Sequence, residues 1–320
     1  MKTEYSSKLA HYISAFVAMK HSSGIKYETA EYYLQDFDNY CIQQTCDNSL
    51  SRDLVLGWAK IRDRESPAVH VLRLSPLREL GKYMQSIGIS EAYVLPTGLS
   101  GKISRYVPHF FTNEELTAFF AQCDNLKPHQ SNRARHLVLP CLFRLLYCCG
   151  LRTCEARTLR VENVGLDDGY IDIINSKGCI SRRIFISDDL LSLFRKYNER
   201  ISQIYPQRVY FFPTTRSECY KSLSETFRRI WRTAGLGSGC GNRPRAYDFR
   251  HNFALSNLNR WIASGIDVNS RLPYLSRYMG HSCIESTDDY LHLVPEFFHT
   301  FNQKVRTTES LLPEVDYGDE

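Results

Sequence analysis

The feature that most constrains this fold is a break in hydrophobic periodicity over residues 96–108. Upstream of it, residues 8 to 94 repeat apolar side chains at helical spacing, which predicts a small bundle of helices without strands. The break has the sequence PTGLSGKISRYVP, in which glycine, serine and basic residues occur without apolar periodicity. We therefore predict a helical domain over residues 1–95, a linker over 96–108 and a second domain over 109–306, although an ordinary surface loop would look similar.

The second domain is expected to combine helices with a small sheet. A long apolar run over residues 137–147 predicts core helices. Residues 170–174 and 183–186 alternate apolar and polar side chains and flank Ser176-Lys177-Gly178, which is typical of a β-hairpin with Lys177 at its turn. The expected fold class is mainly α with a small antiparallel β-sheet.

Local signals predict where several helices begin and end. Thr112-Asn113-Glu114-Glu115 is typical of a helix start. Ser222-Leu223-Ser224-Glu225 has the pattern of a capping box, and one apolar face follows it. Pro273 is expected to open a helix that ends at Gly280. Residues 307–320 are acidic and are expected to form a mobile tail.

Length and charge allow a broad class of functions. A chain of 320 residues can form two domains that each bury a core. A net charge of +5 and a pI near 8.6 permit a polyanionic partner without requiring one. The N-terminus lacks the apolar core of a signal peptide, and no apolar run reaches the roughly 18 residues of a membrane span. We therefore expect a cytoplasmic protein that does not cross a membrane.

Cysteine usage indicates reduced thiols. The chain has 11 cysteines, an odd number. The spacing of Cys41 and Cys46 and the adjacency of Cys148 and Cys149 match neither a disulfide framework nor a zinc site. Mostly buried, reduced thiols are the expected state.

Residue types suited to phosphodiester cleavage occur in order along the second domain. Arg152 and Arg250 can pair bidentately with phosphate oxygens, and Lys177 can give a proton to a leaving oxygen. His281 can donate a hydrogen bond to the developing charge, and Tyr290 can attack phosphorus to leave a phosphotyrosine ester. Storing the bond energy in that ester is the chemistry of strand transfer. No carboxylate cluster resembles a two-metal site, so neither a metal nor another cofactor is expected.

Each of these residues alone has a plainer structural explanation. Tyr290 could be a core ring with a wet hydroxyl group. Arg152 could be half of a helix ion pair with Glu155. Their ordered occurrence favours a shared site.

Three segments carry a resemblance to the tyrosine recombinase (phage integrase) family. Residues 145–159, which contain Gly-Leu-Arg152, resemble its first conserved box, and Asp248-Phe249-Arg250-His251 resembles the second. Residues 275–281, followed by Tyr290, resemble the third. The likeness covers about residues 108 to 300, and the N-terminal helices are similar to the family's core-binding domain. It implies a helical core-binding domain plus an α+β catalytic domain.

The resemblance also implies roles. Arg152 and Arg250 would clamp the scissile phosphate, and Lys177 would protonate the leaving 5′-hydroxyl. His281 would assist the transition state while Tyr290 forms a 3′-phosphotyrosyl bond. The side chains that would support these groups are Glu155 and Asp248.

One position departs from the family pattern. Tyr247 stands where the family usually has a histidine. A phenol, whose pKa is about 10, donates a hydrogen bond but accepts a proton poorly near neutral pH. General-base assistance to Tyr290 is therefore in question.

Double-stranded DNA is the expected partner, gripped between the two domains. Basic residues are plausible phosphate ligands as a population, and they are Lys60, Arg62, Arg64, Arg73, Lys102, Arg105, Arg228, Arg229 and Arg232. For the three arginines of residues 228–232, a solvated helix face is the alternative. Family members work as tetramers on paired sites and pass a C-terminal segment to a neighbour. Phe297, Phe298 and Phe301 would suit that exchange or, equally, packing within the chain.

Four functions compete. The first is a site-specific recombinase, an integrase or transposase of a mobile element. The second is an Xer-like resolvase of chromosome or plasmid dimers, and the third is a type IB topoisomerase. The fourth, from another class, is a non-catalytic DNA-binding regulator in which Tyr247 marks a decayed site.

Overall fold

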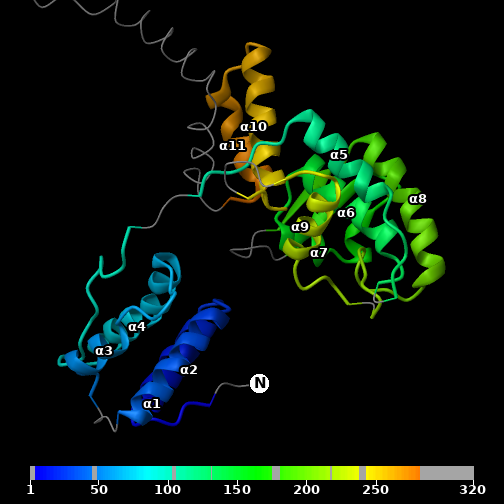
Figure 1. Cartoon of the computed structure of the whole chain (residues 1–320). Coiled ribbons are helices and arrows are strands. Elements are labelled where there is room, and N and C mark those ends of the chain that lie inside the picture. Colours follow the sequence, from blue (N-terminus) through cyan, green and yellow to red (C-terminus); the bar gives the residue numbers. More distant parts are fainter. Residues whose placement is uncertain are drawn as a thin grey trace, which may run out of the picture. The chain divides into compact units, whose positions relative to one another are not determined.

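A computed structural model gives the fold of the chain (Figure 1). The residues that it describes are 4–44, 49–102, 106–130, 132–174, 181–216, 218–237 and 243–281. The chain divides into two compact units, Met1–Arg105 and Tyr106–Glu320. The division falls inside the predicted linker.

The first unit is helical in the part that the structure describes. Its helices are α1 (Ala10–Ser22), α2 (Glu28–Gln43), α3 (Arg52–Trp58) and α4 (Pro67–Ser86). Ser51 and Ser66 cap α3 and α4 by accepting hydrogen bonds from the backbone N–H groups of Leu54 and Val69. Phe16, Phe37 and Trp58 bring the inner faces of the helices into one buried core.

The two ends of the predicted linker are bonded to different units. His70 Nε2 lies 2.8 Å from the Ala59 carbonyl, which can only accept, so Nε2 carries the proton. His70 Nδ1 therefore accepts from the Ser100 hydroxyl group at 3.0 Å, which holds this part of the linker on the first unit. At the other end, the Tyr106 hydroxyl group donates to Asp248 in the second unit at 2.7 Å.

The second unit surrounds a long buried helix with further helices and a small sheet. The helices are α5 (Asn113–Asp124), α6 (Arg135–Cys149), α7 (Thr153–Arg157), α8 (Asp188–Ile204), α9 (Ser224–Thr233), α10 (Asp248–Ala263) and α11 (Val268–Met279), with a short 3₁₀ turn at Val161–Asn163. The strands are β1 (Val164–Gly165), β2 (Tyr170–Ile173) and β3 (Arg182–Phe185). They form an antiparallel sheet in the order β1-β2-β3, with Ile171 opposite Ile184. The predicted fold class is confirmed.

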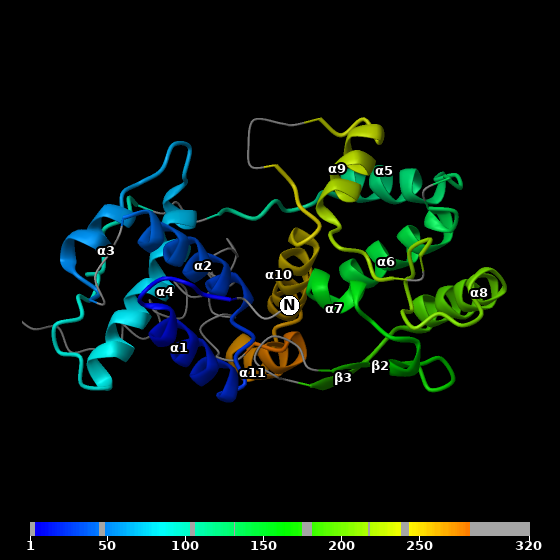
Figure 2. The ribbon, with the colours of Figure 1, turned by 90° about the horizontal axis from the view of Figure 1, so that it is seen from below.

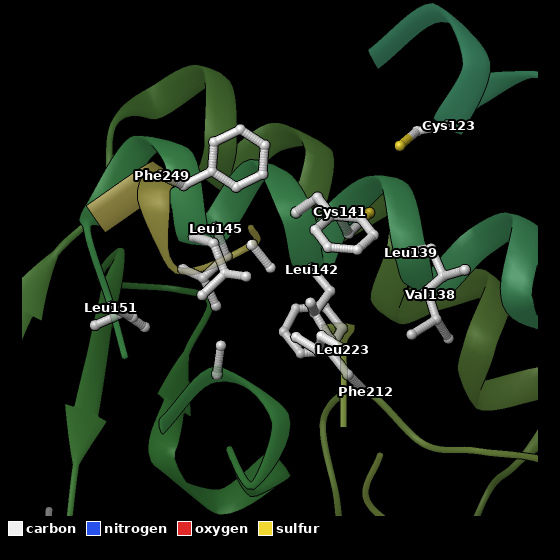
Figure 3. Close-up of a cluster of buried hydrophobic side chains, with 14 of the residues drawn as sticks. Cys123, Val138, Leu139, Cys141, Leu142, Leu145, Leu151, Phe212, Leu223 and Phe249 are labelled. Atoms are coloured by element: carbon white, nitrogen blue, oxygen red, sulfur yellow. The ribbon is translucent and has the colours of Figure 1, made fainter. Parts of the chain in front are cut away.

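The core of the second unit forms on α6 and reaches the first turn of α10. Leu142 and Leu145 on α6 lie among buried side chains that include Phe249, Phe212 and Leu223 (Figure 3). The Phe249 ring is fully buried and packs 4.8 Å from Phe111. Because Phe249 is anchored in this core, its neighbour Arg250 has a fixed position in α10.

Two predicted helix starts are wrong and one is confirmed. Thr112 and Glu115 form the reciprocal capping box that opens α5. The box predicted from Ser222 to Glu225 does not form: the Ser222 hydroxyl group accepts from the Ser224 backbone N–H group at 3.2 Å, and Leu223 holds the N-cap position before α9. Pro273 lies inside α11, which begins earlier because the Asp267 side chain caps it.

The described cysteines are free, and Cys41, Cys123, Cys141 and Cys149 are buried among them. In the part of the chain that the structure describes, no helix combines the length and apolar character that crossing a membrane requires.

Candidate active site

Arg250 joins the ends of two helices that are distant in sequence. Its side chain is buried, and its Nη1 and Nη2 atoms donate to the carbonyl groups of Gly150, at 2.8 Å, and Met279, at 2.7 Å. Gly150 ends α6 with φ +58°, and a Cβ atom there would lie 2.4 Å from the Phe253 ring. Glycine at this position therefore allows both the turn and the close approach of α10.

Arg152 begins α7 and contacts the end of α11. Its backbone N–H group donates to Glu155 Oε2 at 2.9 Å, and its Nη1 donates to Glu155 Oε1 at 2.9 Å. The ion pair considered from sequence is therefore present. Nη2 also donates to the Gly280 carbonyl at 2.5 Å, so the same guanidinium group binds a segment 128 residues away.

A third arginine, Arg182, belongs to this cluster, and the sequence reasoning missed it. Its Nη1 and Nη2 donate to the two oxygens of Glu155 at 3.1 and 2.9 Å, and its Nε donates to the Tyr278 carbonyl at 2.6 Å. These bonds bring β3 and α11 side by side (Figure 2). Strand alternation could have found it, because Arg182 shares the inward face with buried Ile184.

Gly280 and His281 lie against this cluster. Gly280 has φ +69°, and a Cβ atom there would lie 2.7 Å from Arg182 Nη1 and 3.3 Å from Arg152 Nη1. The next backbone N–H group, that of His281, closes the end of α11 by donating to the Ser276 carbonyl at 3.0 Å. The sharp turn directs the chain into the cluster of arginines.

The His281 imidazole is neutral near pH 7. Its pKa is lowered to about 4, first by burial and then by the positive charges of Arg250, Arg152 and Arg182. Glu155 opposes this effect more weakly. A neutral ring can donate through one nitrogen and accept through the other.

Asp248 supports the first turn of α10 from a fully buried position. Its carboxylate accepts from the Tyr106 hydroxyl group at 2.7 Å and from the Arg245 backbone N–H group at 2.8 Å. The Arg245 guanidinium group stacks 3.2 Å from the centre of the Tyr106 ring. Burial is the largest cause that raises the pKa of Tyr106 to about 12, and the hydrogen bond to Asp248 is the next, so Tyr106 remains a hydrogen-bond donor.

Tyr247 occupies the N-cap position of α10 without a side-chain capping bond, and it is partly exposed. Its ring meets the edge of the His251 ring at 5.2 Å. Burial lowers the pKa of His251 to about 4, so this neighbour is also neutral near pH 7.

Two of the predicted catalytic residues, Lys177 and Tyr290, lie outside the described residues. The structure brings together Arg152, Glu155, Arg250 and His281, and it adds Arg182. In the described part of the chain, no group of three or more histidine, cysteine or acidic side chains could hold a metal ion. Guanidinium groups around a neutral imidazole form a cluster whose charge is suited to an anion such as a phosphodiester.

One predicted phosphate ligand is contradicted by the structure. Arg73 is buried, because it pairs with Glu65 at 2.7 Å and donates to the Trp58 and Lys60 carbonyl groups at 2.6 and 2.9 Å. The other predicted ligands that the structure describes are exposed, and they are Lys60, Arg62, Arg64, Lys102, Arg228, Arg229 and Arg232. Arg105 lies outside the described residues.

Known proteins resemble this chain in sequence and in fold. The model of the phage integrase family matches residues 109–296. A putative integrase/recombinase of Sinorhizobium fredii, y4rB, is 26% identical over 292 residues, which cover 89% of this chain and 92% of that protein.

Solved structures share the fold. XerH site-specific recombinase, in a post-cleavage complex with a palindromic difH substrate, matches with a TM-score of 0.63 and 19% identity, covering 86% of this chain and 78% of that one. A lambda integrase tetramer bound to a Holliday junction matches with a TM-score of 0.60 and 18% identity, covering 88% and 76%.

The matched residues 109–296 span more than half of the chain and include the arginine cluster. The chain therefore belongs to the phage integrase family and is a tyrosine-type site-specific recombinase.

Proposed function

We propose that this chain cuts and rejoins double-stranded DNA through a 3′-phosphotyrosyl intermediate, as the integrase or transposase of a mobile element. The observation that carries the proposal is the convergence of Arg152 and Arg250 on the turn that presents His281. Each guanidinium group is oriented by carbonyl contacts, which fix its plane without removing its positive charge. Such a cluster of positive charge is suited to bind and neutralise a phosphodiester.

The proposed roles follow from charge and proton state. Arg152 and Arg250 clamp the non-bridging oxygens and stabilise the charge that develops there. Tyr290 attacks phosphorus, the bond to the 5′-oxygen breaks, and Lys177 gives that oxygen its proton. Attack by a 5′-hydroxyl group on the phosphotyrosine ester reverses these steps and reseals a strand without ATP.

His281 has a proton-transfer role that a charged imidazole could not fill. Because its pKa is about 4 in the absence of DNA, the neutral ring has a nitrogen that can accept the proton of Tyr290, while its other nitrogen can donate a hydrogen bond to the phosphate. Tyr247, in the family's histidine position, supplies a hydrogen-bond donor to the same phosphate. Glu155 and Asp248 hold Arg152 and the start of α10 in place.

Duplex DNA is the proposed partner, bound by both units. The exposed basic residues contact phosphates as a population, so binding should weaken steeply as salt is raised. The proposed assembly is a tetramer on paired sites, for which the lambda integrase tetramer on a Holliday junction is the structural parallel. The segment with Phe297, Phe298 and Phe301 is the proposed element of exchange between subunits.

An Xer-like dimer resolvase is the second candidate, because XerH has the same fold. The two roles differ in where the protein attaches to the genome. A mobile-element enzyme should form adducts at the ends of its element, whereas a dimer resolvase should form them at one chromosomal or plasmid resolution site.

The test is to trap covalent adducts on DNA of the source organism. Purified protein is incubated with sheared, nicked total DNA in excess EDTA, and the DNA that stays bound after denaturation is sequenced. We expect adducts at discrete sites with the parent chain and with Tyr274→Phe, a control at an exposed tyrosine of α11. Tyr290→Phe should bind the recovered duplex and yield no adduct.

Two results would reject this mechanism. Adduct formation by Tyr290→Phe at the parent rate would remove Tyr290 as the nucleophile. Loss of the adduct in EDTA, with a divalent ion restoring the chemical step, would show that the positive charge of the arginine cluster is insufficient.

A further inference from the structure

We propose that Arg182 is a positioning residue for strand cleavage, which acts by holding Glu155 and the end of α11 so that Arg152 is aimed at the phosphate. The reaction in question is the proposed function above. Among the described residues, Arg182 is the cation that joins the sheet both to Glu155 of α7 and to the end of α11.

The contacts of Arg182 suit orientation rather than direct phosphate binding. Each of its nitrogens donates to the protein, with both Nη atoms on Glu155 and Nε on the Tyr278 carbonyl. Both Nη atoms of Arg182 are paired with the carboxylate of Glu155, whose side chain is only 2% exposed. A carboxylate so deeply buried needs charged partners, and Arg182 supplies a bidentate one. Arg250 is buried as well, but its Nη atoms donate to uncharged carbonyl groups, so its positive charge is not matched in this way.

Glu155 transmits this constraint to Arg152. Its Oε1 accepts from Nη1 of both arginines, at 2.9 Å from Arg152 and 3.1 Å from Arg182. Its Oε2 accepts from the Arg152 backbone N–H group and from Arg182 Nη2, both at 2.9 Å. The carboxylate is therefore held between the two arginines. Loss of its bonds to Arg182 would allow it to rotate away from Arg152.

Arg182 also fixes the turn on which His281 stands. It binds the Tyr278 carbonyl, while Arg152 binds that of Gly280 and Arg250 that of Met279. Three successive carbonyl groups are thus each held by a different arginine. A shift of the turn would therefore rotate the guanidinium groups, and a rotation of a guanidinium group would shift the turn.

The next residue on the strand provides a matched control. Arg183 also makes a bidentate pair, with Asp172 at 2.8 and 2.7 Å, and it stacks on Tyr170. Its side chain is 51% exposed, on the opposite face of β3. An effect that depends on the site should appear at Arg182 and not at Arg183.

The variants are Arg182→Lys, which keeps the charge and loses the fork, Arg183→Lys, Glu155→Gln and the double variant Arg182→Lys with Glu155→Gln. Single-turnover cleavage is measured at saturating protein on a nicked duplex recovered by adduct mapping. We expect Arg182→Lys to cleave about a hundredfold more slowly, the effect of a displacement of about 1 Å on a catalytic group. Its affinity for the duplex should stay within about threefold of the parent, and Arg183→Lys should match the parent in both.

The double variant separates positioning from a general loss of structure. If Arg182 acts through Glu155, the double variant should cleave no more than about threefold more slowly than the slower single variant. Multiplied losses, or parent-rate cleavage by Arg182→Lys well below its melting temperature, would overturn the proposal.

A second readout does not depend on DNA cleavage. Inorganic phosphate is titrated into each full-length variant while the His281 ring is followed by NMR. Arg182→Lys should need at least about fivefold more phosphate than the parent, and Arg183→Lys should not. An unchanged phosphate titration in Arg182→Lys would reject the positioning role even if the parent forms adducts. A changed titration without any adducts in the parent would support anion binding by the arginine cluster and reject recombination.

Discussion

Replacing Arg73 with methionine should destabilise the first unit by about 3–5 kcal/mol, the usual cost of removing one partner of a buried ion pair. The side chains of Arg73 and Glu65 are 1% and 5% exposed, and two hydrogen bonds of 2.7 and 2.8 Å join them. The substitution would leave the Glu65 carboxylate buried and deprive the Trp58 and Lys60 carbonyl groups of their donor. Because domains are stable by only about 5–15 kcal/mol, this is a large share.

Equilibrium urea unfolding of the full chain, with hydrogen exchange of the α3 and α4 amides, measures this loss. Arg62→Met is the control, because Arg62 lies near the same Trp58 ring but forms an exposed pair with Asp36. Its loss should cost less than about 1 kcal/mol.

Acidification should reduce the difference in free energy of unfolding between Arg73→Met and the parent. The bond from Arg73 lowers the pKa of Glu65 to about 2, against an ordinary value of 4.5. A carboxylate with a lowered pKa stabilises the fold above pH 4.5, and this contribution is lost as the pH falls toward 2. If Arg73→Met unfolds within about 1 kcal/mol of the parent but loses DNA binding, the structural role is refuted and Arg73 is a phosphate ligand.

Three further predictions concern the second unit. Tyr247→Phe should slow single-turnover cleavage about five- to two-hundredfold, for a loss of about 1–3 kcal/mol, and Tyr247→His should stay active with a rate inflection near pH 6.5; parent-rate cleavage by Tyr247→Phe would restrict this ring to packing. Tyr106→Phe removes a donor from fully buried Asp248, so it should lower the melting temperature and the cleavage rate, whereas Tyr170→Phe, at a tyrosine that also stacks on an arginine, should change neither. The melting temperature of the parent should fall as the pH is lowered from 6.5 to 4, because the unfolded chain takes up protons that His281 and His251 do not; His281→Gln should reduce that slope and leave the share of His251, and an equal slope in both proteins would contradict the lowered pKa of His281.

Helical periodicity and local capping were sufficient to predict much of the fold. The helices of the first unit follow from apolar residues at helical spacing, and the pairing of β2 with β3 follows from alternating apolar and polar residues on both sides of a turn. The capping box at Thr112 formed because both of its hydrogen bonds lie within one turn. The box at Ser222 did not form, because its hydroxyl group accepts from the Ser224 backbone N–H group and buried Leu223 takes the N-cap position. Pro273 is inside α11 for a related reason, since the stronger cap at Asp267 starts the helix earlier.

Sequence alone indicated the residue types of the site and their order along the chain, because the functional groups of arginine, histidine and tyrosine can be read directly from the sequence. Only the tertiary structure decided which cations face the site and which hold the fold together. Arg73 and Arg183 look alike as exposed charges in a sequence, yet one is buried against Glu65 and the other lies open to solvent. Arg182 joins the site through Glu155, 27 residues away, and through the carbonyl of Tyr278, 96 residues away. Such contacts depend on how β3, α7 and α11 pack, and no local repeat encodes that packing.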